Sequence, residues 1–265
     1  MSIRIGVAQF AATTDKQANL ATAIELIERA AADGLELVVL PENSMYSNPD
    51  PTADISGAVE SLDGPFATGV REAAKRLGIA VVAGMTERLQ DDRRASNTVI
   101  AADAGGELVG VYRKVHLYDA FGYRESDRIK PADFVPLTFK LGGLTFGVMT
   151  CYDLRFPEIA RLLVDAGANA IIVPAAWVVG PSKEDHWTTL ARARAIENTS
   201  YLVVSGQTGP SCTGQSMIID PMGVIAASAG EAPGIASATV TADRVDQVRA
   251  KNPSLANRRF TVSAG

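Results

Sequence analysis

The sequence is poor in the residues that several specialised protein classes require. Its 265 residues include only two cysteines, Cys151 and Cys212, so no disulfide framework is expected and a reducing compartment is the default. Histidine is equally scarce, at His116 and His186, and no His-Glu-x-x-His segment is present, so a zinc site is not expected. We therefore expect a protein that works without a metal or other cofactor.

Long apolar runs and blocks of basic residues are also missing. No apolar run approaches the ~20 residues that a membrane span needs, and residues 1–10 have the pattern of a strand and not of a signal peptide. The formal net charge is −5 without a basic cluster, which argues against nucleic acid and anionic membranes as partners. With 47% hydrophobic residues, the chain can bury a substantial core. We expect a cytoplasmic protein.

Strand and helix patterns alternate from one end of the chain to the other. No low-complexity linker or change of composition interrupts them, so a single α/β domain over residues 1–265 is expected. Turn signals at Gly142-Gly143 and at Pro221-Met222-Gly223 predict hairpins, and hence mixed sheets. The predicted helices cover residues 16–32, 65–77, 156–166, 185–198 and 241–251. The predicted strands cover residues 3–10, 35–40, 79–84, 96–102, 108–112, 136–140, 144–150, 170–174, 201–205, 216–220 and 234–240.

Three reactive side chains each follow a predicted strand. Glu42 comes after residues 35–40, Lys114 after Tyr112-Arg113, and Cys151 after residues 144–150. Ligands of α/β sheets usually lie at the carboxyl ends of strands, because these ends are rigid and the loops beyond them open to solvent. A carboxylate can take the proton of a thiol, and an ammonium can stabilise an oxyanion. The set indicates thiol-based acyl transfer.

Each of these residues also has an ordinary interpretation when it is taken alone. An isolated cysteine is usually a core residue, and Cys212, in a Gly- and Ser-rich loop, keeps that interpretation. Lys114 alone would be a surface charge, and Glu42 a loop carboxylate or a helix cap. Cys151, however, stands between a strand and a helix start, where backbone N–H groups are free to bind an oxyanion. We expect a neighbouring ammonium to lower the pKa of its thiol.

The three contexts together identify a family. The chain resembles the nitrilase, or carbon–nitrogen hydrolase, superfamily in Leu40-Pro41-Glu42, in residues 113–117 (RKVHL) and in residues 150–158 (TCYDLRFPE). The resemblance extends over almost the whole chain and implies a four-layer α-β-β-α sandwich. Further similar segments are residues 185–187, 192–198, 214–216 and 220–223.

The resemblance also implies roles for individual residues. Glu42 would be the general base and acid, Lys114 the oxyanion stabiliser, and Cys151 the nucleophile. Glu125 stands where many members have a second glutamate, which would orient the substrate amide and the lysine. The backbone N–H of Tyr152 would share the oxyanion with Lys114. The implied reaction converts a small linear amide to a carboxylate and ammonia through a thioester.

The sequence leaves the exact substrate open. Tyr152-Asp153 after the nucleophile resembles the branch of ω-amidases and deaminated-glutathione amidases, whereas nitrile-hydrolysing members usually have Trp-Glu there. Hydrolysis of nitriles or N-carbamoyl compounds is the alternative within the superfamily. If the substrate carries a carboxylate, Arg155, Arg124 and Lys183 are the candidates to bind it, although each is also typical of a surface charge or a structural ion pair.

Two other interpretations, and the state of assembly, complete these expectations. Cys151 could pair with His116 or His186 as in Cys-His hydrolases, or the chain could be a catalytically silent binding module on the same fold. The resemblance further implies a homodimer or an assembly of dimers. Its contacts would involve the helices predicted at residues 156–166 and 185–198, the first of which carries Ile159, Leu162 and Leu163.

Overall fold

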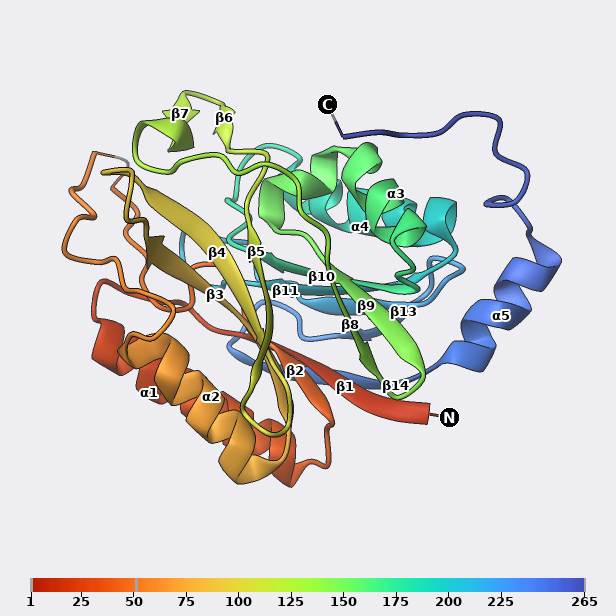
Figure 1. The fold of residues 1–265 in the computed structure, drawn as a ribbon, viewed down its shortest axis with the longest axis horizontal. Helices are drawn as coiled ribbons and strands as arrows, with labels where there is room; N and C mark the ends of the chain where they lie inside the picture. The colour runs from red at the N-terminus through yellow and green to blue at the C-terminus, as the bar shows by residue number, and fades with distance from the viewer. Residues whose placement is uncertain (1, 51, 265) are drawn as a thin grey trace.

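Two six-stranded sheets lie face to face, and helices cover the outer face of each (Figure 1). The computed structural model describes residues 2–50 and 52–264. The α/β class and the four-layer α-β-β-α architecture expected from the sequence are confirmed. The helices are α1 (Lys16–Ala32), α2 (Pro65–Leu77), α3 (Pro157–Asp165), α4 (Lys183–Asn198) and α5 (Ala242–Lys251), with 3₁₀ turns η1 (Glu125–Asp127) and η2 (Cys151–Arg155).

Both sheets are mixed, as the hairpin signals predicted. In spatial order the first sheet contains β14 (Gly234–Thr241), β1 (Ser2–Gln9), β2 (Leu37–Val39), β3 (Ala80–Arg88), β4 (Ala95–Ala102) and β5 (Leu108–Arg113). The second contains β13 (Ile225–Ser228), β12 (Met217–Ile219), β11 (Tyr201–Gly206), β10 (Ala170–Ala175), β9 (Leu144–Val148) and β8 (Leu137–Leu141). In each sheet three consecutive strands are parallel, β1-β2-β3 and β9-β10-β11, and the other pairs are antiparallel.

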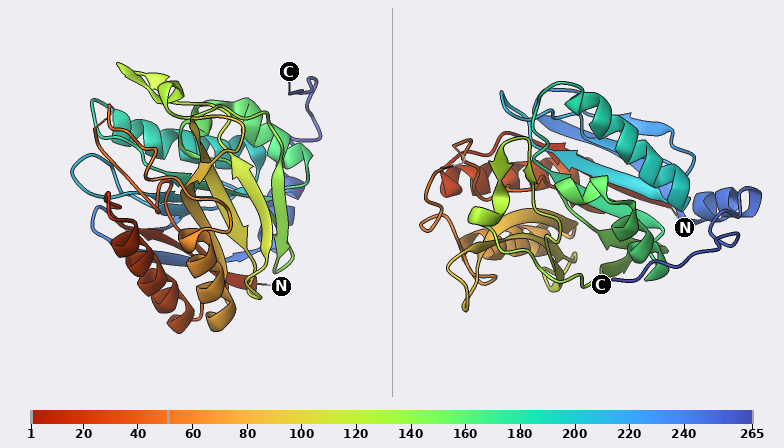
Figure 2. Two further views of the ribbon diagram at one scale, coloured as in Figure 1. Left: turned by 60° about the vertical axis from the view of Figure 1, so that its left-hand side comes forward. Right: turned by 90° about the horizontal axis from the view of Figure 1, so that it is seen from above.

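The parallel strands require crossover connections, and the helices supply them. α1 and α2 pack on the first sheet, whereas α3 and α4 pack on the second (Figures 1 and 2). Local sequence signals set their ends: Asp15 caps α1 by accepting from two backbone N–H groups, and Gly78 ends α2 in the left-handed conformation. No helix of the described residues is long and apolar enough to cross a membrane.

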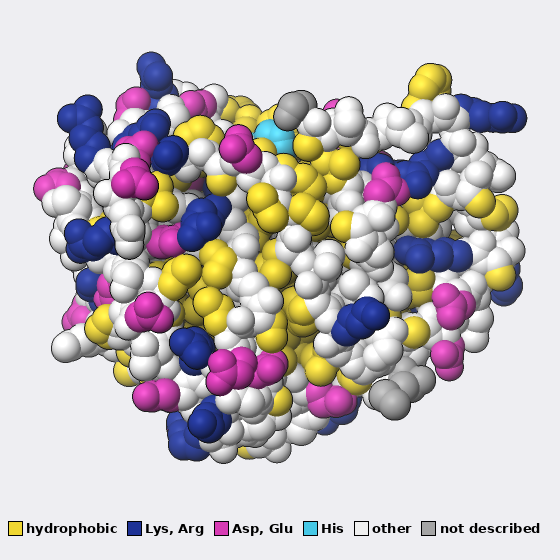
Figure 3. Space-filling view, in the orientation of Figure 1, with side chains coloured by type: hydrophobic (Ala, Val, Ile, Leu, Met, Phe, Trp, Pro, Cys, Tyr) yellow, Lys and Arg dark blue, Asp and Glu magenta, His cyan; other side chains and the backbone are white. Residues whose placement is uncertain are grey.

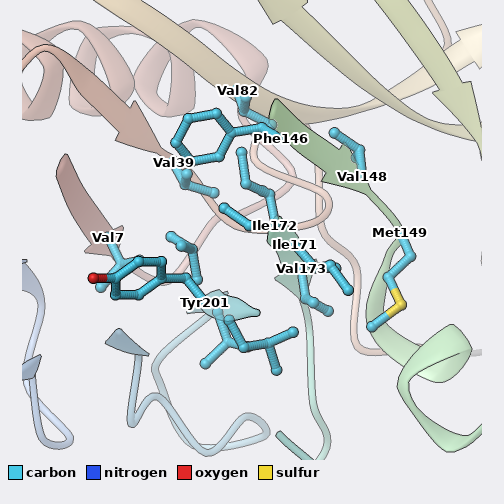
Figure 4. Packing of buried hydrophobic residues seen from close by; sticks show 14 of the residues in the cluster. Val7, Val39, Val82, Phe146, Val148, Met149, Ile171, Ile172, Val173 and Tyr201 are labelled. Atoms are coloured by element: carbon cyan, nitrogen blue, oxygen red, sulfur yellow. The ribbon is translucent and has the colours of Figure 1, made fainter. Parts of the chain in front are cut away.

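The main core lies between the two sheets. Val7, Val39 and Val82 of the first sheet face Phe146 and Ile172 of the second (Figure 4). All five side chains are buried, and removal of such apolar surface from water is the dominant favourable term in folding. The face of the molecule shown in Figure 3, in contrast, carries charged side chains of both signs without a large patch of either.

Tight turns join the antiparallel strands where the sequence predicted them. Gly142 and Gly143 both have positive φ, at 57° and 81°, and connect β8 to β9 in a two-residue hairpin with Leu141 opposite Leu144. The turn at residues 220–223 connects β12 to β13, and the carboxylate of Asp220 accepts from the backbone N–H groups of Met222 and Val224.

A few elements differ from the sequence-based expectation. Helix α4 begins at Lys183, two residues before the predicted start at Asp185. β13 was not predicted, because it is a largely exposed edge strand without alternation of apolar and polar residues. The short ladder of β6 (Asp119–Ala120) and β7 (Tyr123–Arg124) was also missed, since two-residue strands carry too little pattern to detect.

Close packing at Gly84 fixes the path of the chain after β2. A Cβ atom at Gly84 would lie 2.6 Å from Glu42 Cα, 2.7 Å from the Pro41 carbonyl oxygen and 2.8 Å from the Asn43 nitrogen. These are backbone atoms, which cannot move aside as the end of a flexible side chain can. Gly84 therefore lets β3 lie directly against the segment that carries Glu42.

We predict that Gly84→Ala lowers the free energy of unfolding by ~1–3 kcal/mol, the usual cost of overpacking a core. Gly57→Ala is the matched control, because a Cβ atom there would meet nothing within 4 Å. Urea denaturation of both variants and of the parent measures the effect. Equal midpoints for Gly84→Ala and Gly57→Ala would show that this contact does not constrain the fold.

Candidate active site

The carboxylate of Glu42 is held by polar groups from three other parts of the chain. Glu42 follows β2 and is 2% exposed. Its Oε1 accepts from Lys114 Nζ at 2.9 Å and from Asn97 Nδ2 at 2.7 Å, and its Oε2 accepts from the backbone N–H of Ala176 at 2.6 Å. Both carboxylate oxygens are therefore fixed in position.

A second carboxylate binds the same ammonium. Lys114 follows β5 and donates from Nζ to Glu125 Oε2 at 2.9 Å, in addition to Glu42. Glu125, at the start of η1, also accepts from the backbone N–H of Tyr118 at 2.7 Å and from Asn97 Nδ2 at 3.0 Å. The result is a buried cluster of one cation between two anions, with Asn97 bridging the anions.

Cys151 reaches this cluster from the opposite sheet. It follows β9 and begins η2 with a φ of 47°, a left-handed conformation that is uncommon for a residue with a side chain. Thr150 before it forms a capping box with Asp153. Cys151 is buried and lines the same cavity as Glu42 and Glu125. The chain therefore turns sharply at Cys151, with the backbone N–H of Tyr152 in the first turn of η2.

The charges of the cluster set the resting protonation states. Burial opposes ionisation of Glu42, yet the ammonium of Lys114 and the hydrogen bonds from Lys114 and Asn97 hold the pKa of Glu42 below its ordinary value. The pKa of Lys114 is raised well above its ordinary value, because Glu125 and Glu42 outweigh the cost of burial. Glu42 is therefore ionised and Lys114 is charged at neutral pH.

The thiol differs from the sequence-based expectation. We expected the neighbouring ammonium to lower the pKa of Cys151, but burial and the negative charge of Glu42 raise it well above its ordinary value. The lysine acts against this shift and is too weak to reverse it. Cys151 is therefore a neutral thiol at rest, beside an ionised carboxylate.

Asp153 connects the cysteine turn to the lysine strand. Its carboxylate is fully buried and accepts from Tyr112 Oη at 2.6 Å, from Thr150 N at 3.0 Å and from His116 N at 3.1 Å. His116 Nδ1 also lies 2.8 Å from it. Because Thr150 precedes Cys151 and His116 follows Lys114, the Asp153 carboxylate fixes the Cys151 segment relative to the Lys114 segment.

A cavity of about 420 Å³ opens above Cys151. Aromatic side chains line it, including Tyr118, Phe121, Tyr152 and Trp177. Other lining residues are Glu42, Glu125, Arg155, Lys183 and Cys212. Of the three candidates for binding a carboxylate, Arg155 and Lys183 line the cavity, whereas Arg124 is exposed and lies 3.6 Å from Asp127.

Neither histidine hydrogen-bonds the thiol in the described part of the chain. His116 binds Asp153, and its ring stacks on Phe156 at 3.8 Å between centroids. His186 lies on α4, and its Nδ1 has no partner among the described residues. Residues 2–50 and 52–264 also contain no group of three or more His, Cys, Asp or Glu side chains arranged to hold a metal ion.

Sequence reasoning missed two residues that organise the site, Asn97 and Asp153. Asn97 lies in β4, where all eight residues are buried. A polar residue in such an apolar strand usually has a specific partner, and this signal could have identified it. Asp153 gave no equivalent signal, because its partners Tyr112 and His116 are about forty residues away in the sequence.

Comparison with known proteins assigns the family. The carbon-nitrogen hydrolase family matches residues 4–250, so the chain belongs to this family, within the nitrilase superfamily, and is an enzyme of the carbon–nitrogen hydrolase class. The deaminated glutathione amidase of Escherichia coli O157:H7 is 41% identical over 258 residues, which cover 97% of each chain.

Two solved structures show the same fold. The NitFhit protein of C. elegans has a TM-score of 0.91 at 29% identity, over 98% of this chain and 66% of that longer chain. A variant of the amidase from Nesterenkonia sp. AN1 has a TM-score of 0.83 at 27% identity, over 97% of this chain and 94% of that chain. In that amidase the acetamide moiety of fluoroacetamide is covalently attached to the active-site cysteine.

We predict that Asp153→Asn lowers the free energy of unfolding by ~1–3 kcal/mol, because the amide NH₂ would face buried donors that then lose their acceptor. Asp165→Asn is the control: Asp165 forms a half-exposed surface pair with Arg258, and such pairs contribute ~0–1 kcal/mol. Chemical denaturation of the two variants compares these losses. The account of Asp153 is wrong if its variant loses no more stability than Asp165→Asn.

Proposed function

We propose that this enzyme hydrolyses a small linear amide to a carboxylate and ammonia through a thioester on Cys151. The observation that carries the proposal is the buried cluster in which Lys114 binds both Glu42 and Glu125, together with the cavity that Glu42, Glu125 and Cys151 line. The amidase names of the E. coli and Nesterenkonia relatives point to the same reaction.

The first half of the reaction forms the thioester. As the sulfur of Cys151 attacks the carbonyl carbon, its proton passes to ionised Glu42. The ammonium of Lys114 and the backbone N–H of Tyr152 stabilise the oxyanion. Glu42 then gives the proton to the substrate nitrogen, the C–N bond breaks, and ammonia leaves.

The second half uses the same carboxylate on water. Glu42 takes a proton from the water as its oxygen attacks the thioester carbon, and Lys114 and the Tyr152 N–H again stabilise the oxyanion. The C–S bond then breaks and Glu42 returns the proton to sulfur. The products are the free carboxylic acid and the neutral thiol from which the cycle began.

Glu125 and Arg155 act on the geometry of the substrate in this scheme. Glu125 holds the Lys114 ammonium at 2.9 Å and offers an acceptor for the NH₂ group of a primary amide. Arg155, which follows Cys151 by four residues and lines the cavity, contacts the rest of the substrate. Asn97 donates to both Glu42 and Glu125 and so fixes the distance between the two carboxylates.

The same site leaves a nitrile or N-carbamoyl compound as the alternative substrate. An apolar nitrile has no NH₂ donors, so one carboxylate of the pair would lose a hydrogen bond at a cost of ~1–3 kcal/mol. The intact Glu42, Lys114 and Cys151 set argues against a silent binding module, which would not need all three.

We predict faster hydrolysis of an amide than of the nitrile with the same carbon skeleton, measured as kcat/KM for ammonia release. Cys151→Ala should abolish turnover with the fold intact, and Lys114→Ala should reduce kcat at least ~100-fold, the scale for one lost oxyanion donor. Cys212→Ala is the matched control, since that thiol has no role in the scheme. A higher kcat/KM for the nitrile would overturn the amidase assignment, and an active Cys151→Ala would overturn the mechanism.

We predict that kcat/KM for a neutral amide falls on the acidic side only below pH 4.5, the ordinary carboxyl value, since the pKa of Glu42 is lowered from it. As pH falls through this lowered pKa, Glu42 gains a proton and can no longer accept one from the thiol. The raised pKa of Lys114 keeps it charged on the alkaline side up to at least 10.5. A fall of kcat/KM that begins near neutral pH would instead indicate a histidine base.

We also propose that the enzyme assembles as a homodimer or a larger assembly of dimers. Of the three α3 residues that the sequence suggested for the contact, Ile159 and Leu163 are buried within the same chain and Leu162 is half-buried. The proposal rests instead on an exposed apolar group made by Ile196 near the end of α4 and by Met222 and Val224 in the adjacent turn between β12 and β13, which are 46%, 53% and 59% exposed. Exposed apolar clusters of this kind are typical of protein interfaces.

We predict a dimer or larger species for the parent protein by light scattering at micromolar concentration. Ile196→Asp should shift it toward the monomer, because a charge in an apolar interface must be desolvated. Val135→Asp, at an exposed site elsewhere, is the control. A monomeric parent protein would contradict the proposal.

A further inference from the structure

A second cavity, of about 440 Å³, lies apart from the one above Cys151, and the two share no lining residue among the described residues. Its walls come from the loop before α2, from the turn between β3 and β4, and from the end of η1. The loop and the turn lie on the same side of the molecule (Figure 1). The volume is in the range of small-molecule binding sites.

The second cavity is rich in arginine. Its lining includes Arg88, Arg93, Arg94 and Arg128. Arg94 is neutralised, because its Nη2 lies 3.0 Å from Asp92 Oδ2. The other three form no ion pair with any described residue; Arg88 and Arg128 donate to backbone carbonyls and to a tyrosine hydroxyl, which carry no charge. Three guanidinium groups thus meet at one cavity without an anion.

The acidic residues of this lining are engaged elsewhere. Asp92 binds Arg94, and the Asp54 carboxylate accepts from the backbone N–H of Ser56 at 2.8 Å and from its hydroxyl at 2.9 Å. Asp127 lies 3.6 Å from Arg124, which is not part of the lining. Four arginines against three aspartates leave the cavity with a positive charge, and its unpaired donors are cationic.

We propose that this cavity binds the phosphate group of a small sugar or polyol phosphate. Guanidinium forks donate pairs of N–H groups to phosphate oxygens, and one phosphate has enough oxygens for more than one arginine. The hydroxyls of Thr52 and Ser56, which line the same cavity, suit a hydroxylated ligand body. No aromatic side chain is among the described lining residues, so a nucleotide base would have no ring to stack on.

The walls are held in place before a ligand binds. The backbone N–H of Ala95 donates to the Arg128 carbonyl at 2.9 Å, and the N–H of Lys130 donates to the Ala95 carbonyl at 2.8 Å. Arg94 Nη1 also donates to the Ser126 carbonyl at 3.4 Å. These bonds join the start of β4 to the segment that follows η1. A ligand therefore meets arginines on a fixed frame, which reduces the entropy lost on binding.

The first test is titration calorimetry with inorganic phosphate at constant ionic strength, so that the screening of charges does not change. The parent protein should bind phosphate saturably with a Kd of about 1 mM or tighter. Arg88→Met and Arg93→Met should each weaken binding about 10-fold or more, the effect of one charge-assisted hydrogen bond. The control Arg76→Met removes the same charge from an exposed pair with Glu28 and should leave the Kd unchanged. Equal Kd values for all four proteins, or no saturable binding to the parent protein, would overturn the proposal.

A second set of titrations examines the body of the ligand. Glycerol 3-phosphate should bind more tightly than inorganic phosphate, and AMP should not bind more tightly than glycerol 3-phosphate. Ligand binding should also raise the thermal unfolding midpoint of the parent and of Arg76→Met, but not of Arg93→Met. Co-sedimentation with phosphatidic acid vesicles in place of binding to the soluble phosphates would refute a small-molecule site. None of these measurements involves turnover, so their outcome is independent of the proposed hydrolysis.

Discussion

The position of one ammonium determines much of the architecture around it. Lys114 is 2% exposed, and a cation that deep in a protein is tolerated only when anions and hydrogen-bond acceptors surround it. Glu42 from the end of β2 and Glu125 from η1 provide those anions, and Asn97 from β4 keeps the carboxylates at a fixed separation. Loss of Glu42 or Glu125 would remove part of the negative charge that stabilises the buried Lys114 ammonium. The segments that carry these residues are therefore held close together by electrostatics.

The need for contacts between distant segments explains what the sequence could and could not predict. Glu42, Lys114 and Cys151 were identifiable because each directly follows a strong strand pattern, and strand ends are where α/β sheets display polar side chains. The α/β class and the two tight hairpins also followed from local patterns, which depend on residues that are close together in the sequence. The number of layers followed from the family resemblance alone.

Interactions between distant segments were not accessible in this way. Asp153 binds Tyr112 and His116 across about forty residues, and the backbone N–H that fixes Glu42 Oε2 belongs to Ala176, more than one hundred residues further on. The net pKa shift of Cys151 differed from the expectation for the same reason. The lysine does lower the thiol pKa as expected, but burial and the charge of Glu42 raise it further, and both are properties of the folded chain.

The distribution of charge in the cavity also bears on the release of product. In the proposed reaction, hydrolysis would turn a neutral amide group into a new carboxylate beside Glu42 and Glu125. Like charges at short range repel strongly where the dielectric is low. Departure of the acid would therefore be assisted by the same side chains that position the amide.

A neutral nucleophile has a consequence for the lifetime of the enzyme in an oxidising cell. Peroxides oxidise thiolates much faster than thiols, and the first product, a sulfenic acid, leads on to forms that are not reversible. Because the pKa of Cys151 is raised, its sulfur presents little thiolate to oxidants at rest, and in the proposed mechanism it would lose its proton only as a substrate carbonyl is attacked. The arrangement that delays formation of the nucleophile thus also protects it, and the enzyme should outlast those whose cysteine is permanently ionised.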